Sequence, residues 1–234
     1  MGERSVVVVG GTGGIGSAVA ERFALAGARV RAVGLRADQA SASLAAMVDI
    51  TELDVRLADD LSAFIAGVGE LDVLVNAAGV IRRGREFEPL VFAEVLEVNL
   101  TSAMRACLAA KPMLAAAGGC VVNVASMLSF FGSPQAPAYS ASKGGIVALT
   151  RSLAVAWAAD GIRVNAVAPG WIRTDLTSAL QQDPAQERRI LDRTPMRRWG
   201  TPADICGAVA FLAGPDAAFI TGAVLPVDGG YLAS

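Results

Sequence analysis

Residues 6–16 have the sequence Val-Val-Val-Val-Gly-Gly-Thr-Gly-Gly-Ile-Gly, and this stretch decides the fold. Four β-branched residues in a row predict a short buried strand, and residues 17–26 after the glycines are typical of a helix. Gly10, Gly14 and Gly16 permit a tight turn and close approach of the backbone to a pyrophosphate at the helix N-terminus. A flexible glycine-rich turn is the alternative. Because the glycines follow the first strand and open a helix, dinucleotide binding is favoured.

Segments typical of strands and helices alternate along the rest of the chain. Further strands are expected at residues 28–33, 53–55, 71–75, 120–124, 163–168 and 223–227, and the main helices at residues 57–66, 89–111, 139–159 and 202–212. This alternation predicts a parallel sheet covered on both faces, and right-handed crossovers make it doubly wound. We therefore expect an α/β fold, a Rossmann-type sandwich with a central seven-stranded parallel sheet and helices on both faces. The connection from the second to the third strand is expected to be short.

Length and composition indicate one domain with an apolar surface. Residues 1–234 are expected to form a single dinucleotide-binding and catalytic domain, with a polar flap over the substrate at about residues 175–200. Charged residues make up 18% of the chain, below the usual share of roughly 25%. We therefore expect a homotetramer, in which the Ala-rich helices around Asn99 and Tyr139 pack against their symmetry mates.

Charge and residue usage disfavour several classes of function. A net charge of −2, without basic runs flanked by aromatic residues, argues against nucleic-acid binding. Three widely spaced cysteines indicate reduced thiols in a cytoplasmic protein, and no apolar run is long enough for a signal peptide or a membrane span. The chain contains no histidine, which removes the usual general base and the commonest metal ligand. We expect no metal site.

Tyr139 and Lys143 are four residues apart and share one face of a predicted helix. A cation close to a phenol favours the phenolate and lowers the tyrosine pKa towards the neutral range. A surface lysine beside a half-buried tyrosine is the alternative reading. However, only two of the 20 basic residues are lysines, so a lysine at this position in an Arg-rich chain suggests a need for an exchangeable proton.

Small and polar residues follow the predicted strands where they end. Asn76 to Gly79, Ser126, and Pro169-Gly170 all lie at such ends. Because the carboxyl ends of parallel strands meet at one edge of a sheet, we expect these residues to line one cleft. Asn99 lies in the middle of a predicted helix, where asparagine is a poor helix former, so it either caps or bends the helix or holds a water molecule.

Together these motifs resemble the short-chain dehydrogenase/reductase family across essentially the whole chain. Asn99, Ser126, Tyr139 and Lys143 match the family's catalytic tetrad. The residues that correspond to its cofactor site are Gly10, Thr12, Gly14, Ile15, Gly16, Asp54, Val55, Asn76, Ala77, Ala78, Gly79, Pro169, Gly170, Ile172 and Thr174, together with Tyr139 and Lys143. The chain departs from the family pattern at Val9, where threonine is usual, and at Ala77, which replaces the second asparagine of the N-N-A-G motif.

The resemblance implies hydride transfer between a nicotinamide and a secondary alcohol or ketone. Tyr139 would be the acid/base, Ser126 would hold the substrate oxygen, and Lys143 would lower the Tyr139 pKa and bind the nicotinamide ribose. Asn99 would hold a water molecule in a proton relay. NAD and NADP are both open, because Gly34-Leu35 supplies no carboxylate to repel a 2′-phosphate and Arg36 could meet one, whereas the substrate resemblance favours NAD.

A finer resemblance is to the sugar-acid branch of the family, which includes gluconate 5-dehydrogenase and 2-dehydro-3-deoxygluconate 5-dehydrogenase. It rests on Gly79-Val80-Ile81-Arg82-Arg83, on residues 125–130, and on residues 190–200. The substrate is then expected to be a small anionic molecule, with Arg82 and Arg193 binding its carboxylate. A cyclitol, diol or dihydrodiol dehydrogenase is the first alternative. A non-catalytic dinucleotide-sensing protein is the second, although it would not need Ser126 together with Tyr139 and Lys143.

Overall fold

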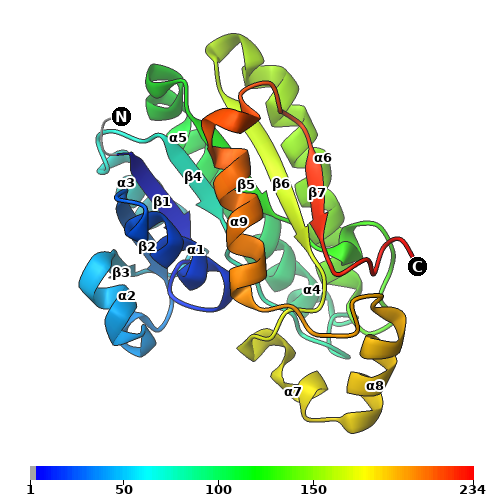
Figure 1. The fold of residues 1–234 in the computed structure, drawn as a ribbon. Helices are drawn as coiled ribbons and strands as arrows, with labels where there is room; N and C mark the ends of the chain where they lie inside the picture. Colours follow the sequence, from blue (N-terminus) through cyan, green and yellow to red (C-terminus); the bar gives the residue numbers. More distant parts are fainter. Residues whose placement is uncertain (1–3) are drawn as a thin grey trace.

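The computed structural model describes residues 4–234 and contains one seven-stranded parallel sheet in the order β3-β2-β1-β4-β5-β6-β7 (Figure 1). Its strands are β1 (Ser5–Val9), β2 (Arg29–Gly34), β3 (Asp49–Glu52), β4 (Val73–Asn76), β5 (Cys120–Val124), β6 (Arg163–Pro169) and β7 (Val224–Val227). The strand order reverses between β1 and β4, and such a switch point leaves a crevice at the carboxyl ends of the strands. The predicted fold class is confirmed.

Helices cover both faces of the sheet, as Figure 1 shows for α1 and α9 in front and α5 and α6 behind. The first face is covered by α1 (Gly14–Leu25), α2 (Ala42–Met47) and α9 (Pro202–Ala213), and the second by α3 (Ala58–Ala66), α5 (Ser102–Ala117) and α6 (Pro137–Trp157). In β1, Val6 and Val8 pack on the first face, and Val7 and Val9 pack on the second. Burial on both sides explains why this strand is continuously apolar.

The turn after β1 brings α1 directly against the backbone of the strand end. Gly10 has a φ of 82°, a left-handed conformation that favours glycine. A Cβ atom on Gly16 would lie 2.0 Å from the Gly10 carbonyl oxygen, so no other residue fits there without moving the helix. The predicted need for glycine at these two positions therefore comes from backbone conformation at Gly10 and from close packing at Gly16.

Three predicted elements differ from the structure. The third strand, expected at residues 53–55, is β3 at Asp49–Glu52, because its pairing with β2 ends where Gly34 pairs with Glu52. The connection from β2 to β3 is not a short link, because it contains a 3₁₀ turn (Ala37–Gln39) and α2. The Ser41 hydroxyl caps α2, but the helix buries little besides Leu44, so its sequence lacks the apolar periodicity that would have revealed it. Such a short helix depends on its cap and on the neighbouring sheet.

The single helix expected at residues 89–111 is divided into α4 (Pro89–Leu96), a π-helical turn (Glu97–Thr101) and α5. Two side-chain hydroxyls donate hydrogen bonds to backbone carbonyls four or five residues earlier. Ser102 Oγ donates to the Val98 carbonyl at 2.7 Å, and Thr101 Oγ1 donates to the Leu96 carbonyl at 3.5 Å. Side-chain bonds of this kind compete with the helical ladder and bend helices. The turn contains Asn99, so the helix is irregular at the asparagine that the sequence marked either as a local distortion or as a holder of water.

The segment predicted as a flap contains a 3₁₀ turn (Asp175–Thr177), α7 (Ser178–Gln181) and α8 (Pro184–Arg193). In Figure 1 both helices lie beyond the carboxyl ends of the strands, apart from the layers that cover the sheet. Asp183 caps α8 by accepting hydrogen bonds from the backbone N–H groups of Ala185 and Gln186. The segment is therefore well formed, and its role as a cover for the substrate stays a prediction.

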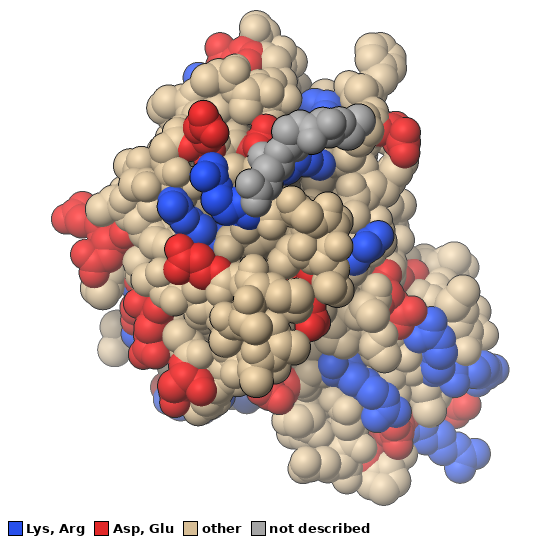
Figure 2. All heavy atoms as spheres, turned by 60° about the vertical axis from the view of Figure 1, so that its left-hand side comes forward, with Lys and Arg blue, Asp and Glu red and all other residues tan. Residues whose placement is uncertain are grey.

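The surface shows no large region of one charge sign on the face drawn in Figure 2, where acidic and basic side chains are interspersed. Several large apolar side chains are exposed, among them Leu90 (87%) and Phe87 (71%) near α4 and Val155 (83%) on α6. The predicted homotetramer would cover side chains of this kind, and it stays a prediction. No helix within residues 4–234 combines the length and the apolar character needed to cross a bilayer.

Candidate active site

A cleft of about 370 Å³ opens at the carboxyl ends of the strands, beside the switch point. The predicted site residues that line it are Gly10, Thr12, Gly14, Ile15, Arg36, Asp54, Val55, Ala77, Ala78, Gly79, Arg82, Tyr139, Lys143 and Thr174. Residues that are far apart in the sequence, from four strand ends and two helices, therefore meet in one place. Of the strand-end residues expected to line one cleft, Ala77, Ala78 and Gly79 do so, whereas Asn76, Ser126, Pro169 and Gly170 are not among its lining residues.

The remaining predicted residues support this cleft from behind or beside it. Gly16 packs under the glycine turn, and the buried Asn76 lies between β5 and α5, where its Nδ2 donates to Asn123 Oδ1 at 2.8 Å and to Cys107 Sγ at 3.3 Å. Gly170 donates its N–H to the Val227 carbonyl at the end of β6. Pro169 ends the same strand, and Ile172 is buried and bridges to Gly200 next to the flap. None of these five residues lines the cleft, and they support the elements that do.

The glycine turn fits a dinucleotide phosphate. A Cβ atom on Gly13 would meet nothing within 4 Å, so the backbone there is open. Gly13 is the N-cap of α1 and supplies no side-chain hydrogen bond, which leaves the first N–H groups of the helix without a side-chain partner. Free N–H groups and the positive end of a helix dipole bind phosphate oxygens.

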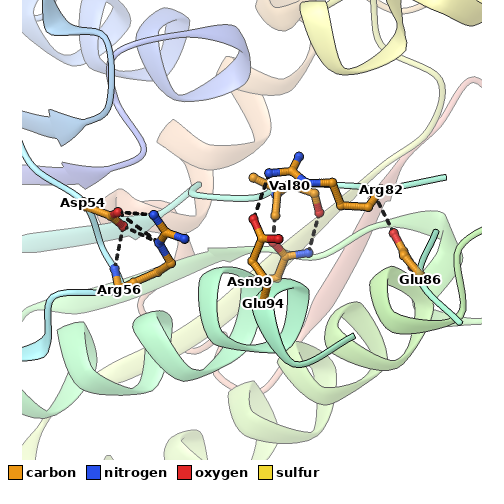
Figure 3. Close-up of polar contacts among 7 residues, drawn as sticks. All are labelled: Asp54, Arg56, Val80, Arg82, Glu86, Glu94 and Asn99. Atoms are coloured by element: carbon orange, nitrogen blue, oxygen red, sulfur yellow. Dashed lines mark hydrogen bonds and ion pairs between the residues drawn. The ribbon is translucent and has the colours of Figure 1, made fainter. Parts of the chain in front are cut away.

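The adenosine end of the cleft carries two arginines. Arg36 follows β2 in a left-handed conformation, is exposed, and makes no ion pair within residues 4–234. Arg56 binds the carboxylate of Asp54 through its side chain and its backbone N–H (Figure 3), and these hydrogen bonds hold the Asp54 pKa below its usual value. The Asp54–Arg56 pair was not predicted, although acid and base two residues apart at a strand end are visible in the sequence.

Ser126, Tyr139 and Lys143 come from two adjacent elements. Ser126 follows β5 and begins a short 3₁₀ turn (Met127–Ser129), where its Oγ accepts a hydrogen bond from Leu128 N at 3.1 Å. Ser129 Oγ donates to the Lys143 carbonyl at 2.8 Å and so ties this turn to α6. Lys143 Nζ donates to the Val124 carbonyl at 2.7 Å and lies 5.8 Å from the centre of the Tyr139 ring.

Burial governs the acidity of these groups. It raises the pKa of Tyr139, and the Ser126 hydroxyl and the positive charge of Arg83 oppose that rise only in part. The Lys143 ammonium donates its hydrogen bond to Val124 and not to the phenol, and the expectation that it lowers the Tyr139 pKa stays a prediction. Burial also lowers the pKa of Lys143 to about 8. Lys143 is therefore a cation that can lose its proton close to neutral pH.

Asn99 fixes the loop that follows β4. Its Oδ1 accepts from Val80 N at 2.7 Å, and its Nδ2 donates to the Val80 carbonyl at 2.9 Å (Figure 3) and to Ser142 Oγ at 3.0 Å. Ser142 Oγ in turn donates to the Tyr139 carbonyl at 2.7 Å. Both amide hydrogens of Asn99 are thereby used, so its side chain could bind a water molecule only through an oxygen lone pair.

The two arginines expected to bind substrate have other partners. Arg82 Nη2 donates to Glu94 Oε1 at 2.9 Å, as Figure 3 shows, and the guanidinium of Arg193 lies 4.2 Å from the centre of the Tyr231 ring. Arg83 instead interacts with Tyr139 through its charge, and its Nη1 donates to the Leu176 carbonyl at 3.2 Å. It was one arginine among many in the sequence, and only the fold distinguishes it from its neighbour.

The chain is similar to known dehydrogenases over almost its whole length. A family model described as enoyl-(acyl carrier protein) reductase matches residues 10–232. The chain is 37% identical to 2-dehydro-3-deoxy-D-gluconate 5-dehydrogenase of Escherichia coli K12, over 97% of this chain and 94% of that protein. It is 38% identical to galactitol 2-dehydrogenase (L-tagatose-forming) of Cereibacter sphaeroides, over 96% and 93%.

A solved structure is similar throughout. The crystal structure of a proposed 2-deoxy-D-gluconate 3-dehydrogenase from Agrobacterium tumefaciens, with bound NADP, superposes with a TM-score of 0.91 at 42% identity. The match covers 99% of this chain and 97% of that one. The shared fold, cleft and sequence support an NAD(P) cofactor.

Lys143→Met should remove a pH dependence of stability. The pKa of Lys143 falls from 10.5 to about 8 on burial, so between these values the unfolded chain holds a proton that the folded chain has lost. The free energy of unfolding then rises with pH in this window, by up to about 1.4 kcal/mol per unit, and the burial penalty is largest below pH 8. We expect Lys143→Met to be more stable than the wild type at pH 7 and to lack this rise in urea unfolding.

The control is Lys111→Met, which changes the only other lysine, a half-exposed residue paired with Asp160. It should keep the wild-type rise between pH 8 and 10.5. Equal slopes for Lys143→Met and the wild type would show that Lys143 is not desolvated as the structure indicates.

Proposed function

The chain belongs to the short-chain dehydrogenase/reductase family, and we propose that it oxidises a secondary alcohol of a small sugar acid with a preference for NADP. Its family makes it an NAD(P)-dependent oxidoreductase that acts on CH–OH groups. The finer proposal rests on one observation: Arg83 places a guanidinium that has no ion-pair partner within residues 4–234 near the phenol of Tyr139.

The side chains suit general acid/base catalysis at one oxygen atom. The nicotinamide supplies the carbon that exchanges hydride with the substrate. Ser126 would bind the substrate oxygen by hydrogen bond, and Tyr139 would take the alcohol proton as hydride leaves, or return it in reduction. Because Lys143 has a pKa of about 8, it can pass protons between the site and solvent near neutral pH. A chain without histidine thus retains a group that titrates in this range.

Arg83 suits a carboxylate ligand better than the two arginines predicted from the sequence. Burial lowers its pKa, which shows that its guanidinium is partly removed from water, while Arg82 already binds Glu94 and Arg193 already stacks on Tyr231. A guanidinium can bind a carboxylate through two parallel hydrogen bonds and so orient the neighbouring carbinol. Its bond to Leu176 in the flap segment would place the bound acid beneath that segment.

NADP is supported by the charge at the adenosine end of the cleft. Arg36 lines the cleft where β2 ends, and no carboxylate precedes it that would repel a 2′-phosphate. Of the acids at that edge, Glu52 accepts a hydrogen bond from Ala37 N at 3.2 Å, and Asp54 is paired with Arg56. The Agrobacterium protein that is similar over nearly the whole chain binds NADP in its crystal structure.

Tyr139→Phe should abolish turnover and leave cofactor binding nearly unchanged, because it removes only the hydroxyl and keeps the ring. General acid/base catalysis is worth about 10²- to 10⁴-fold, so we expect kcat to fall by at least about 100-fold. The matched control is Tyr231→Phe, the same change at the only other tyrosine. A residual rate above a tenth of the wild type at saturating cofactor, or an equal loss in the control, would refute the assignment.

Arg83→Gln should raise KM for sugar acids while leaving neutral alditols unaffected. A charged hydrogen bond contributes about 1.5–3 kcal/mol, so the expected increase in KM is about 10- to 100-fold. Arg82→Gln is the control, and it should not change the ratio of kcat/KM between acids and alditols. If neutral diols or cyclitols react with higher kcat/KM than every carboxylate in the wild type, the sugar-acid proposal is wrong and the diol alternative replaces it.

Arg36→Asn should weaken NADP binding about tenfold, or about 1.4 kcal/mol, without changing the affinity for NAD. Asparagine tolerates the left-handed conformation of this residue, so the exchange removes charge without adding strain. Arg29→Asn, at the other end of β2, serves as the control. Fluorescence titration with both cofactors measures the effect, and tighter binding of NAD than NADP by the wild type would overturn the preference.

A further inference from the structure

We propose that Glu86 is a positioning residue that joins the N-terminus of α6, which carries Tyr139, to the loop that carries Arg82 and Arg83. The proposal rests on the proposed function, because that function gives Tyr139 its role. Glu86 is fully buried, a rare environment for a carboxylate. Its Oε1 accepts a hydrogen bond from Arg82 N at 2.8 Å, as Figure 3 shows, and its Oε2 accepts one from Tyr139 N at 2.8 Å.

Glu86 serves as the missing cap of α6. The helix begins at Pro137, and its own N-cap residue, Ala136, has no side chain that could accept a hydrogen bond. Tyr139 is the third helical residue, so its N–H belongs to the group that lacks a partner within the helix. A carboxylate placed there satisfies this N–H and interacts favourably with the helix dipole. The cap thus comes from a residue 53 positions earlier in the chain.

The anion has no ion-pair partner that would explain its burial. Within residues 4–234, none of the salt bridges involves Glu86, whereas its neighbour Glu88 pairs with Arg85 at the surface. An isolated buried carboxylate is costly, so the sites that keep one generally use it. The two N–H groups it binds belong to Tyr139 and to the loop that presents Arg83, and these are the two parts of the site that must be held in register.

The charge of Glu86 also acts on the phenol. Burial raises the Tyr139 pKa most, the Ser126 hydroxyl and the positive charge of Arg83 lower it, and the negative charge of Glu86 raises it. Lys143 is the remaining charged group close by, 5.8 Å from the ring centre. Loss of the Glu86 charge should therefore shift the ionisation of Tyr139 to lower pH.

Two substitutions separate the effect of the negative charge of Glu86 from the effect of its side-chain length. Glu86→Gln keeps the length but removes the charge, and its NH₂ group would face an N–H donor in place of one acceptor oxygen. Glu86→Asp keeps the charge but is one methylene too short to contact both N–H groups. We expect kcat to fall about 10- to 100-fold in both variants, because small displacements of a catalytic group are costly. Only Glu86→Gln should shift the ionisation of Tyr139.

The ionisation of Tyr139 can be measured without turnover. In a Tyr231→Phe background Tyr139 is the only tyrosine, so the ultraviolet absorbance of its phenolate reports its titration directly. We expect a lower midpoint for Glu86→Gln, an unchanged midpoint for Glu86→Asp, and an unchanged midpoint and kcat for Glu88→Gln, which alters an exposed carboxylate two residues away. In the pH profile of kcat for alcohol oxidation, the limb that reports the ionisation of Tyr139 should move to lower pH in Glu86→Gln. It should stay in place in Glu86→Asp and Glu88→Gln.

The outcomes distinguish this proposal from the proposed function. An unchanged midpoint and kcat in Glu86→Gln would overturn the positioning role, even if the protein oxidises sugar acids. A shifted midpoint in a protein that oxidises no alcohol would overturn the function and leave the link between Glu86 and Tyr139 intact. If Glu86→Gln fails to fold, Glu86→Asp decides the matter, since a wild-type kcat in that variant would show that the two contacts are not needed.

Discussion

Burial of the Lys143 ammonium is the constraint on which the rest of the site depends. The residue is 4% exposed, and its Nζ reaches the Val124 carbonyl at the end of β5. A desolvated cation needs oxygen partners, so the end of this strand and the start of α6 must stay in register. The same burial brings the Lys143 pKa to about 8, which suits the proton transfer proposed for this side chain. Burial of Lys143 Nζ thus lowers the stability of the folded protein at neutral pH, but it also provides the pKa that the proposed proton transfer needs.

The residues after β4 lie directly against the same side chains. A Cβ atom on Gly79 would make ordinary contacts, 3.6 Å from Lys143 Nζ and 3.7 Å from Asn99 Oδ1, so contact with these atoms does not by itself require glycine. The Asn99 side chain holds Val80 at both its N–H and its carbonyl, and it thereby fixes the start of this loop beside Lys143.

The sequence predicted the layers of the fold because buried parallel strands leave a strong signal. Runs such as Val6 to Val9 are apolar at every position, and each ends in glycine or a small polar residue. The π-helical turn at Asn99 and the helix α2 were missed, since both depend on side-chain hydrogen bonds made by Ser and Thr and not on apolar periodicity. Such contacts become visible only when the partner backbone is in place.

The residue types in the sequence predicted which side chains lie near the cleft better than they predicted the pKa values and charge partners there. A Tyr and a Lys four residues apart indicate a pair, but whether the cation lowers the phenol's pKa depends on where Nζ points, and here it points to a carbonyl. Arg82 and Arg83 are adjacent in the sequence, yet one binds Glu94 and the other approaches Tyr139. Glu86 and Glu88 differ in the same way, because one is buried and the other is exposed. The path of the folded backbone decides which side chain of each pair is buried or faces the phenol, and no pattern in the sequence of residues 80–88 reveals it.

The loop between β4 and α4 is anchored at two points that do not involve its arginine side chains. Asn99 holds Val80, and Glu86 holds the backbone N–H of Arg82, so the backbone path past the phenol is determined by residues at either end. Between these anchors the side chains of Arg82 and Arg83 can change without loss of either contact. Glu86 connects the same loop to Tyr139, so the proposed acid/base group keeps its contact with the loop when the arginine side chains vary. A site built in this way can accept different alcohols by substitution within the loop, which agrees with its similarity to one relative named for a sugar acid and another named for galactitol.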